Sequence, residues 1–448
     1  MPRSLPSRAA RLGAVLRRLL SQSDGNIVIM FALSLVPILG ITGLGVEYTR
    51  AVMYRSRLST AADAAAMAAI TTARSYIVNN TKNQTDPTDD GIRQGLARAQ
   101  LAFRANAGSQ LDVTPVTPVV SLTRVGQTLN ATVDYALSYP LLFGALLGQS
   151  SLSLEGNATS SLQIEAYADF YLLLDTSGSM GFPTSRDQQL SFAKMNPDMS
   201  TFGVNNCAFA CHFAGWKGYD ISKANNIELR INTVGKAVQG LIDLAKAKQK
   251  IINQFRVGLY PFVSFMETAA EATTNLDSLY TRAASLESYM DVGDSNTTRG
   301  SGGTHYENVL PTMNAKITRL GDGRTASTPK AFVFLVTDGV ANNQYWYNKT
   351  GWTGSQAKLL DPKLCQPLKD RGVIISVLYV PYEPIAAPFN PSVASENLTV
   401  NGLIPKVPQT LKDCASAGYF RSASTASEIA NALNAMFDQA VAVARLTQ

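Results

Sequence analysis

The chain has 448 residues, of which 46% are hydrophobic, and a formal net charge of +6. This length predicts two or three domains and is enough to bury a sizeable core. The positive charge does not indicate a nucleic-acid partner, because residues 1–25 carry +4, residues 26–60 carry +2 and the remainder is neutral. Basic residues on both sides of an apolar segment are typical of a membrane flank.

The apolar segment at residues 27–46 contains no charged residue. Twenty residues at about 1.5 Å each span the roughly 30 Å hydrocarbon core of a bilayer. The alternative is a signal peptide, which has a shorter apolar core followed by a small-residue cleavage site. Here Glu47 follows directly, so the segment predicts an uncleaved, single-pass membrane anchor. The five arginines that precede it predict a cytoplasmic N-terminus.

Residues 47–78 are rich in alanine and contain neither proline nor glycine, which predicts that the anchor helix continues to about residue 78. Three features together resemble the N-terminal module of TadE/TadG-like Flp (tight-adherence) pilus assembly proteins. They are Asp24-Gly25-Asn26 before the apolar helix, Glu47-Tyr48 after it, and the alanine-rich run from Leu58 to Ala66. The resemblance covers about residues 20–70. It implies a bacterial inner-membrane protein whose main body lies in the periplasm.

Such a module raises the question of processing at Gly25 by a prepilin peptidase. Prepilins of that type carry a glutamate five residues after the cleaved glycine, and Met30 stands at that position here. Processing therefore stays an open alternative to an intact N-terminus.

Residues 79–166 predict a small β-rich region. Loop-forming residues at 79–91 precede a short helical stretch at about 92–107. Apolar and polar residues then alternate in three segments, which predicts strands at 111–122, 127–137 and 151–166. The apolar run at 140–147 is too short to cross a bilayer. It predicts a core helix, with a contact with the membrane surface as the alternative.

Residues 167–448 predict an α/β domain. Continuous apolar runs, typical of buried strands, occur at 170–174, 256–263, 331–336 and 373–380. Helical stretches alternate with them, at 230–252, 305–318 and 427–443. This alternation predicts a parallel sheet covered by helices on both faces. Ligands of such sheets bind at the carboxyl ends of the strands.

Three oxygen-rich loops lie where such a ligand site is expected. Asp175, Ser177 and Ser179 follow the first strand, Thr304 precedes a helical stretch, and Asp338 comes just after the third strand. Carboxylate and hydroxyl oxygens suit a hard divalent cation such as Mg²⁺. Taken alone, the first loop is equally consistent with an Asx or Ser/Thr turn. All three loops in this order favour a metal site.

The order Asp-x-Ser-x-Ser, Thr, Thr-Asp-Gly resembles the metal-ion-dependent adhesion site of von Willebrand factor A domains. The resemblance implies the Rossmann-like parallel sheet of that family. It implies that Ser177, Ser179 and Thr304 bind Mg²⁺, or Mn²⁺, directly, and that Asp175 and Asp338 bind it directly or through water. It also implies that an acidic residue of a protein partner completes the coordination. That partner is expected to be a pilus or envelope component, or a host surface.

The four cysteines are expected to form disulfides outside the cytoplasm, and four cysteines allow three pairings. The preferred pairs are Cys207 with Cys211, in a polar insertion after the first strand, and Cys365 with Cys414. Zinc held by Cys207, Cys211 and His212 is the alternative, although no second His/Cys pair lies nearby in sequence to complete four ligands.

The sequence contains no recognisable catalytic motif. The residues around Ser177 do not form a Gly-x-Ser-x-Gly elbow, and neither a phosphate-binding Gly-x-x-x-x-Gly-Lys loop nor a His-Glu-x-x-His site occurs. Of the two histidines, His212 and His305, the second is best explained as a first-turn helix residue beside the metal loop. We therefore expect a protein that is not an enzyme, with a hydrolase as the alternative.

Four regions are expected: a cytoplasmic tail at 1–25, the membrane helix and its extension at 26–78, the β-rich periplasmic region at 79–166, and the von Willebrand factor A domain at 167–448. They predict a periplasm-facing component of Flp pilus assembly, anchored in the inner membrane, that binds a protein partner through the metal site. The alternative is a structural envelope scaffold assembled through the N-terminal helix, in which the metal only stabilises loops.

Overall fold

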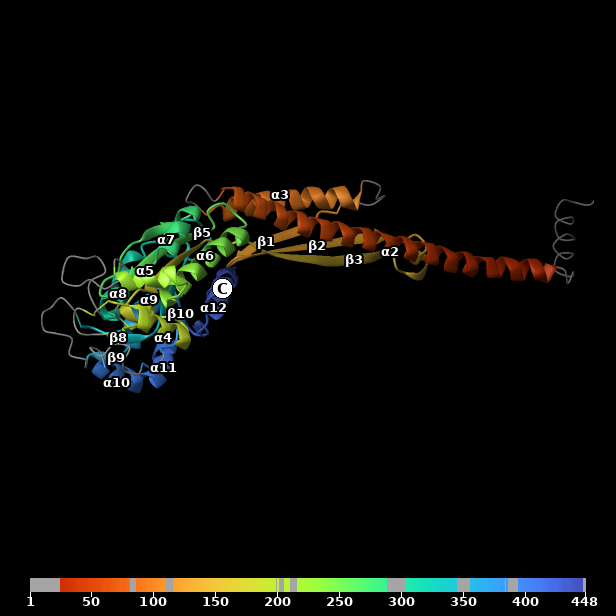
Figure 1. Ribbon diagram of the computed structural model, residues 1–448. Coiled ribbons are helices and arrows are strands. Elements are labelled where there is room, and N and C mark those ends of the chain that lie inside the picture. The colour runs from red at the N-terminus through yellow and green to blue at the C-terminus, as the bar shows by residue number, and fades with distance from the viewer. Residues whose placement is uncertain are drawn as a thin grey trace, which may run out of the picture. The chain divides into compact units, whose positions relative to one another are not determined.

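The computed structural model describes residues 25–80, 86–108, 116–198, 200, 205–209, 216–287, 303–344, 355–382, 384–385 and 394–445 (Figure 1). The chain forms two compact units. The first contains Met1–Tyr76, Thr88–Thr123 and Leu129–Leu162, and the second contains Ile77–Pro87, Arg124–Thr128 and Gln163–Gln448. The four-region division expected from the sequence stays a prediction.

The first unit is organised by one long helix, α2 (Gly25–Asn80). Its apolar side chains from Ile27 to Val46 are largely exposed, and by length and composition the helix can cross a membrane. Beyond Glu47 one side of the helix becomes buried, because small side chains allow close packing there. The buried alanines are Ala51, Ala61, Ala62, Ala65, Ala66, Ala69 and Ala73. The predicted continuation of the helix is confirmed.

Helix α3 (Thr88–Ala107) and a three-stranded sheet complete the first unit. The sheet has the order β1 (Val119–Val125), β2 (Thr128–Pro140), β3 (Ser151–Gln163). Along β2 every second side chain is buried, as expected for a strand with one covered face. On that face the Tyr135 ring lies 6.4 Å from the Phe103 ring of α3, and the Tyr139 ring lies 5.3 Å from Tyr54 of α2. The first predicted strand begins later than expected, at Val119, and residues 109–115 lie outside the described residues.

The apolar run at 140–147 is the connection between β2 and β3 and holds a single 3₁₀ turn, η2 (Gly144–Leu147). Leu142 is 83% exposed and Phe143 is 39% exposed. The expected core helix is therefore wrong. The segment closes a hairpin instead, in which the Leu141 N–H donates to the Ser150 carbonyl at 3.0 Å.

A six-stranded sheet forms the centre of the second unit, in the order β11-β10-β7-β4-β5-β6. Every neighbouring pair is parallel except β5 with β6. The strands are β4 (Ala168–Asp175), β5 (Phe255–Phe262), β6 (Ala270–Thr273), β7 (Lys330–Thr337), β10 (Ile374–Tyr379) and β11 (Phe420–Ser422). The predicted α/β fold is confirmed, and the short edge strands β6 and β11 are additions to it.

Helices cover both faces of this sheet. Phe437 of α12 (Ala426–Arg445) lies 4.8 Å from Phe170 of β4, ring centre to ring centre, and α12 also packs on α6 (Arg230–Lys248). On the opposite face Tyr306 of α8 (Tyr306–Lys316) lies 6.0 Å from Phe262 of β5. The other elements are α4 (Arg186–Met195), α5 (Lys217–Ala224), α7 (Asp277–Ala284), β8 (Val340–Asn342), β9 (Ala357–Leu359), α9 (Gln366–Asp370), α10 (Ala394–Leu403) and α11 (Val407–Cys414).

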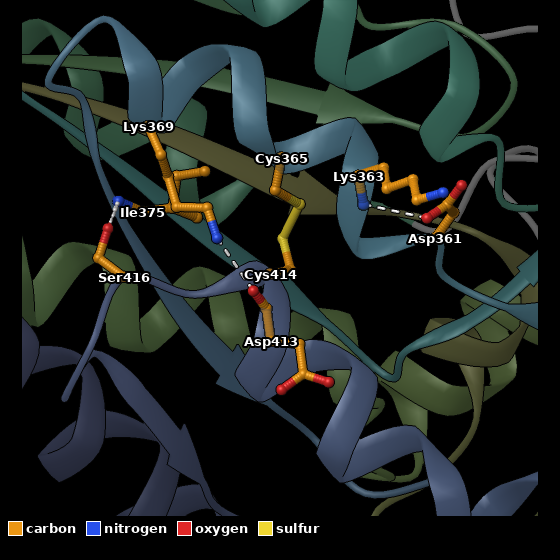
Figure 2. Close-up of a disulfide and its surroundings, with 8 residues drawn as sticks. All are labelled: Asp361, Lys363, Cys365, Lys369, Ile375, Asp413, Cys414 and Ser416. Carbon is orange, nitrogen blue, oxygen red and sulfur yellow. Dashed lines mark hydrogen bonds between the residues drawn. A yellow bond between two sulfur atoms is a disulfide. The ribbon is translucent and has the colours of Figure 1, made fainter.

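One predicted disulfide is present: Cys365 at the end of η6 (Pro362–Cys365) is bonded to Cys414 at the end of α11, with both side chains buried (Figure 2). Close by, the Lys369 ammonium donates to the carbonyl of Asp413 at 3.0 Å. A cross-link between residues 49 apart in sequence stabilises the fold by roughly 4 kcal/mol in the chain-entropy treatment.

The other predicted pair is only partly visible. Cys207 is buried and disulfide-bonded, but Cys211 lies outside the described residues, as does His212. The pairing of Cys207 with Cys211 and its zinc alternative both therefore stay predictions.

Candidate metal site at the carboxyl edge of the sheet

The first loop of the candidate site begins at the last residue of β4, Asp175. Its Oδ1 accepts a hydrogen bond from the Ser177 N–H at 2.9 Å, so the loop does contain the Asx turn that the sequence allows. The turn brings the Ser177 and Ser179 hydroxyl oxygens within 3.1 Å of each other. The loop therefore forms an Asx turn and also brings the two hydroxyl oxygens together, so the turn does not argue against a metal site.

The third loop meets the first because β4 and β7 are neighbouring parallel strands, with Leu174 opposite Val336. The Thr337 hydroxyl donates to Asp175 Oδ2 at 2.6 Å. Asp338 follows at the end of β7 and is fully buried. The order of strands along the chain reverses between β4 and β7, and such a switch point is the usual ligand position in open α/β sheets.

The second loop joins the same edge through backbone hydrogen bonds. The Thr304 N–H donates to the Asn342 carbonyl at 2.8 Å, and the Asn342 N–H donates back at 3.0 Å. The His305 N–H donates to the carbonyl of Val263, just beyond β5, at 3.0 Å. The Tyr306 hydroxyl lies 2.5 Å from Thr337 Oγ1. Thr304 is thus tied to β8, and the two residues after it are tied to the ends of β5 and β7. The role of Thr304 as a ligand stays a prediction.

Two buried carboxylates at one site are electrostatically costly. Burial raises the pKa of Asp175, although hydrogen bonds from Thr337 and Ser177 oppose this shift. Burial and the charge of Asp175 raise the pKa of Asp338, while the Arg230 guanidinium opposes this shift. Neither oxygen of Asp338 has a hydrogen-bond partner of normal geometry among the described residues. A buried carboxylate that accepts no such hydrogen bond is a position that a cation fits.

Among the described residues, Arg230 is a functional candidate that the sequence did not reveal. It is the first residue of α6, is 3% exposed, and places Nη1 3.8 Å from Asp338 Oδ2. That nitrogen has no hydrogen-bond partner among the described residues. A positive charge at a helix N-terminus is unfavourable, so Asp338 offsets this cost. A lone arginine at the start of an apolar helix was the available signal, but the sequence does not show what it faces.

His305 does not belong to the oxygen cluster. Its Nδ1 lies 3.0 Å from Glu307 Oε1, and its Nε2 lies 3.0 Å from the Gln344 carbonyl. Both ring nitrogens are engaged, which agrees with a structural role in the first turn of α8. Within the described parts of the chain, no three His, Cys, Asp or Glu side chains gather closely enough to hold a metal. An ion at this edge would therefore depend on hydroxyl groups and water besides the two carboxylates.

Comparisons with known proteins identify one part of the chain. Residues 25–75 match a family model described as "Putative Flp pilus-assembly TadE/G-like". No curated protein matches the chain.

Three solved structures resemble the chain at low TM-scores. The vWF domain of the type V pili tip protein Mfa5 from Porphyromonas gingivalis is 11% identical, with a TM-score of 0.35, over 64% of this chain and 98% of that one. The PilB minor pilin from Streptococcus sanguinis is 12% identical, with a TM-score of 0.33, over 73% and 78%. The proximal thread matrix protein 1 from the mussel byssus, with a zinc occupied MIDAS motif, is 15% identical, with a TM-score of 0.35, over 62% and 48%. This chain thus spans about half the length of the mussel protein.

At these scores the likenesses imply no shared ligand or activity. The strand order identifies the fold: with β4 taken as the first strand, it is the 3-2-1-4-5-6 order of Rossmann-like sheets, with one antiparallel edge strand. Residues 25–75 are therefore similar to a TadE/G-like family of Flp pilus assembly, and the second unit is a Rossmann-like α/β domain.

Proposed function

We propose that the protein is a component of Flp pilus assembly, anchored in the bacterial inner membrane, whose periplasmic C-terminal domain binds a protein partner through Mg²⁺ or Mn²⁺. The observation that carries this proposal is the buried carboxylate of Asp338 at the switch point of the sheet, which accepts no hydrogen bond of normal geometry among the described residues. The TadE/G-like match supports the pilus context. The exposed apolar part of α2 supports a single-pass anchor, with the preceding arginines in the cytoplasm.

Five residues at the carboxyl edge of the sheet would provide the oxygen ligands of the ion. Ser177, Ser179 and Thr304 would offer hydroxyl oxygens, and Asp175 and Asp338 would offer carboxylate oxygens directly or through water. Hard divalent cations prefer such oxygen ligands. With only two carboxylates, the bound ion retains positive charge and an affinity for a further anion. An acidic side chain of the partner fits this requirement, so the proposed role is binding and not catalysis.

The proposal is tested by calorimetric titration of Mg²⁺ and Mn²⁺ into the full chain in detergent. Asp338→Ala should lose at least tenfold in affinity, because it removes one of the two carboxylates of the site. Asp243→Ala, which removes a largely exposed aspartate of α6, is the matched control and should bind as the wild type does. A folded wild-type chain that binds neither ion would overturn the proposal.

The scaffold function remains a second candidate because of Arg230. Its guanidinium already offsets part of the charge of Asp338 without any ion. In cells, a scaffold would keep pilus assembly after Asp338→Ala and lose it when residues 47–78 are deleted. A metal-dependent binding protein would lose pilus assembly with Asp338→Ala and keep it with Asp243→Ala.

A further inference from the structure

The hairpin between β2 and β3 contacts α2 inside the apolar segment. A Cβ atom added to Gly43 would lie 2.5 Å from the ring of Phe143, so this ring rests directly on the helix backbone. Gly40 and Gly45 have no such neighbour within 4 Å. The Phe143 ring therefore packs specifically at Gly43. This glycine lies about one helical turn before the end of the apolar segment at Val46.

One turn after Gly43, Glu47 holds the backbone of the same hairpin. Its Oε1 accepts hydrogen bonds from the N–H groups of Leu142 and Phe143, and its Oε2 accepts one from Gly144 at 3.2 Å. Glu47 is the first charged residue after the apolar segment, yet only 9% of its surface is exposed. Its carboxylate therefore binds the backbone of the hairpin and not solvent. These hydrogen bonds hold the hairpin beside the end of the apolar segment.

The hairpin itself has the chemistry of a lipid-facing loop. No charged residue occurs between Asp134 and Glu155. Leu142 projects outward, with 83% of its surface exposed. Further N–H groups of the loop are also paired: Gln149 donates to the Gly144 carbonyl at 3.0 Å. Paired backbone groups and uncharged side chains are what a segment needs at the edge of the hydrocarbon, where an unpaired N–H is costly.

We propose that the β2–β3 hairpin is a second membrane contact, which inserts Leu142 into the interfacial layer of the bilayer and is held at that depth by Glu47. The proposal rests on the proposed function in one respect, that residues 27–46 span a bilayer. The occupant is lipid because the hairpin is continuous with the exposed apolar surface of α2: Ile41 is 70% exposed and Val46 57% exposed. The contact adds a second point of attachment and restricts rotation of the first unit about the helix axis.

The test uses the full chain in vesicles of phosphatidylethanolamine and phosphatidylglycerol, with a spin label on Leu142→Cys. No cysteine in the described residues is free, so the label is directed to the new thiol. Leu142 is exposed, so the substitution leaves the packing intact. Leu33→Cys, in the apolar segment, is the lipid reference, and Leu101→Cys, exposed on α3, is the water reference. Accessibility to oxygen and to a water-soluble nickel chelate gives the depth of each label.

We expect the label at residue 142 to favour oxygen over the nickel chelate, as at residue 33 and opposite to residue 101. Glu47→Ala should shift the label at residue 142 toward the value at residue 101 while leaving residue 33 unchanged. A water-like value at residue 142 with a lipid-like value at residue 33 overturns this inference alone. A water-like value at residue 33 overturns the anchor as well.

Two further outcomes contradict the proposal. An immobile label at residue 142 that is shielded from both reagents would show that a protein, such as a second copy of the chain, covers the hairpin. An unchanged depth at residue 142 in Glu47→Ala would show that Glu47 does not hold the loop.

Discussion

Two arginine–aspartate pairs, each with a buried aspartate, lie at opposite ends of the sheet in the second unit. At the amino end, Arg256 Nη1 donates to Asp169 Oδ2 at 3.0 Å, and the same guanidinium donates twice to the Ala272 carbonyl. At the carboxyl end, Arg230 stands 3.8 Å from Asp338 without a hydrogen bond to it. The arginine and aspartate of the first pair are hydrogen-bonded to each other, whereas those of the second are not. The proposed ion would complete the second pair, at the edge of the sheet where ligands of α/β folds usually bind.

The largest expected effect comes from breaking the complete pair. Arg256→Met leaves the buried carboxylate of Asp169 without its partner and should lower the free energy of unfolding by about 4 kcal/mol. Chemical denaturation of the full chain in detergent measures this loss, and Mg²⁺ should not reduce it. Lys248→Met, which removes a half-exposed ion pair with Asp438, is the control and should cost less than about 1 kcal/mol. Equal losses in the two variants would contradict the comparison.

Breaking the incomplete pair should have a smaller effect that depends on metal. Arg230→Met leaves Asp175 and Asp338 without a counter-charge and should cost about 3 kcal/mol in chelator. Saturating Mg²⁺ should restore most of this loss, because an ion that binds only the folded state stabilises it. The measurement is the increase in unfolding free energy on adding Mg²⁺, which should be larger in the variant than in the wild type. If the two increases are the same, Arg230 and the ion do not share a role.

The smallest expected effect is a dependence on pH at the amino end. Burial raises the pKa of Asp169 to about 6, although Arg256 opposes this shift. An unfolded aspartate titrates near 3.9, so between about pH 4 and 6 the folded state binds more protons. The contribution of Asp169 to stability therefore falls by about 2 kcal/mol as pH rises through this window. Asp169→Asn should remove this slope in denaturation curves recorded across it. Parallel pH curves for variant and wild type would show that Asp169 titrates normally.

The parts of the fold that sequence reasoning recovered depend on local patterns. The runs at 170–174 and 331–336 are apolar throughout and correspond to β4 and β7. They predicted strands because a strand that is covered on both faces has apolar side chains at consecutive positions. The loops that carry Asp175 and Asp338 could be placed at one edge because parallel strands end together. Their role as metal ligands remains a prediction.

The parts that were missed depend on contacts between distant residues. Nothing near Arg230 in the sequence shows that it faces Asp338, which lies more than a hundred residues later. The hairpin at 140–147 was misjudged for the same reason. An apolar run is normally buried, but this one is exposed and is hydrogen-bonded to Glu47, which lies 95 residues away in the sequence. Thr337, which connects the two aspartate loops, was visible only as part of the motif Thr-Asp-Gly.

The disulfide of Figure 2 also has a mechanical consequence for the loop at Asp338. The next residue, Gly339, has φ +88°, and a Cβ atom there would lie 2.4 Å from Val407 and 2.8 Å from Leu411 of α11. Helix α11 therefore packs directly against this turn. Cys414 at the end of the helix is disulfide-bonded to Cys365 of η6. If a partner pulls on an ion held at Asp338, the load passes from the turn to α11 and ends on a covalent bond. Under such a load the loop would resist tension most strongly in an oxidising compartment, where that bond persists.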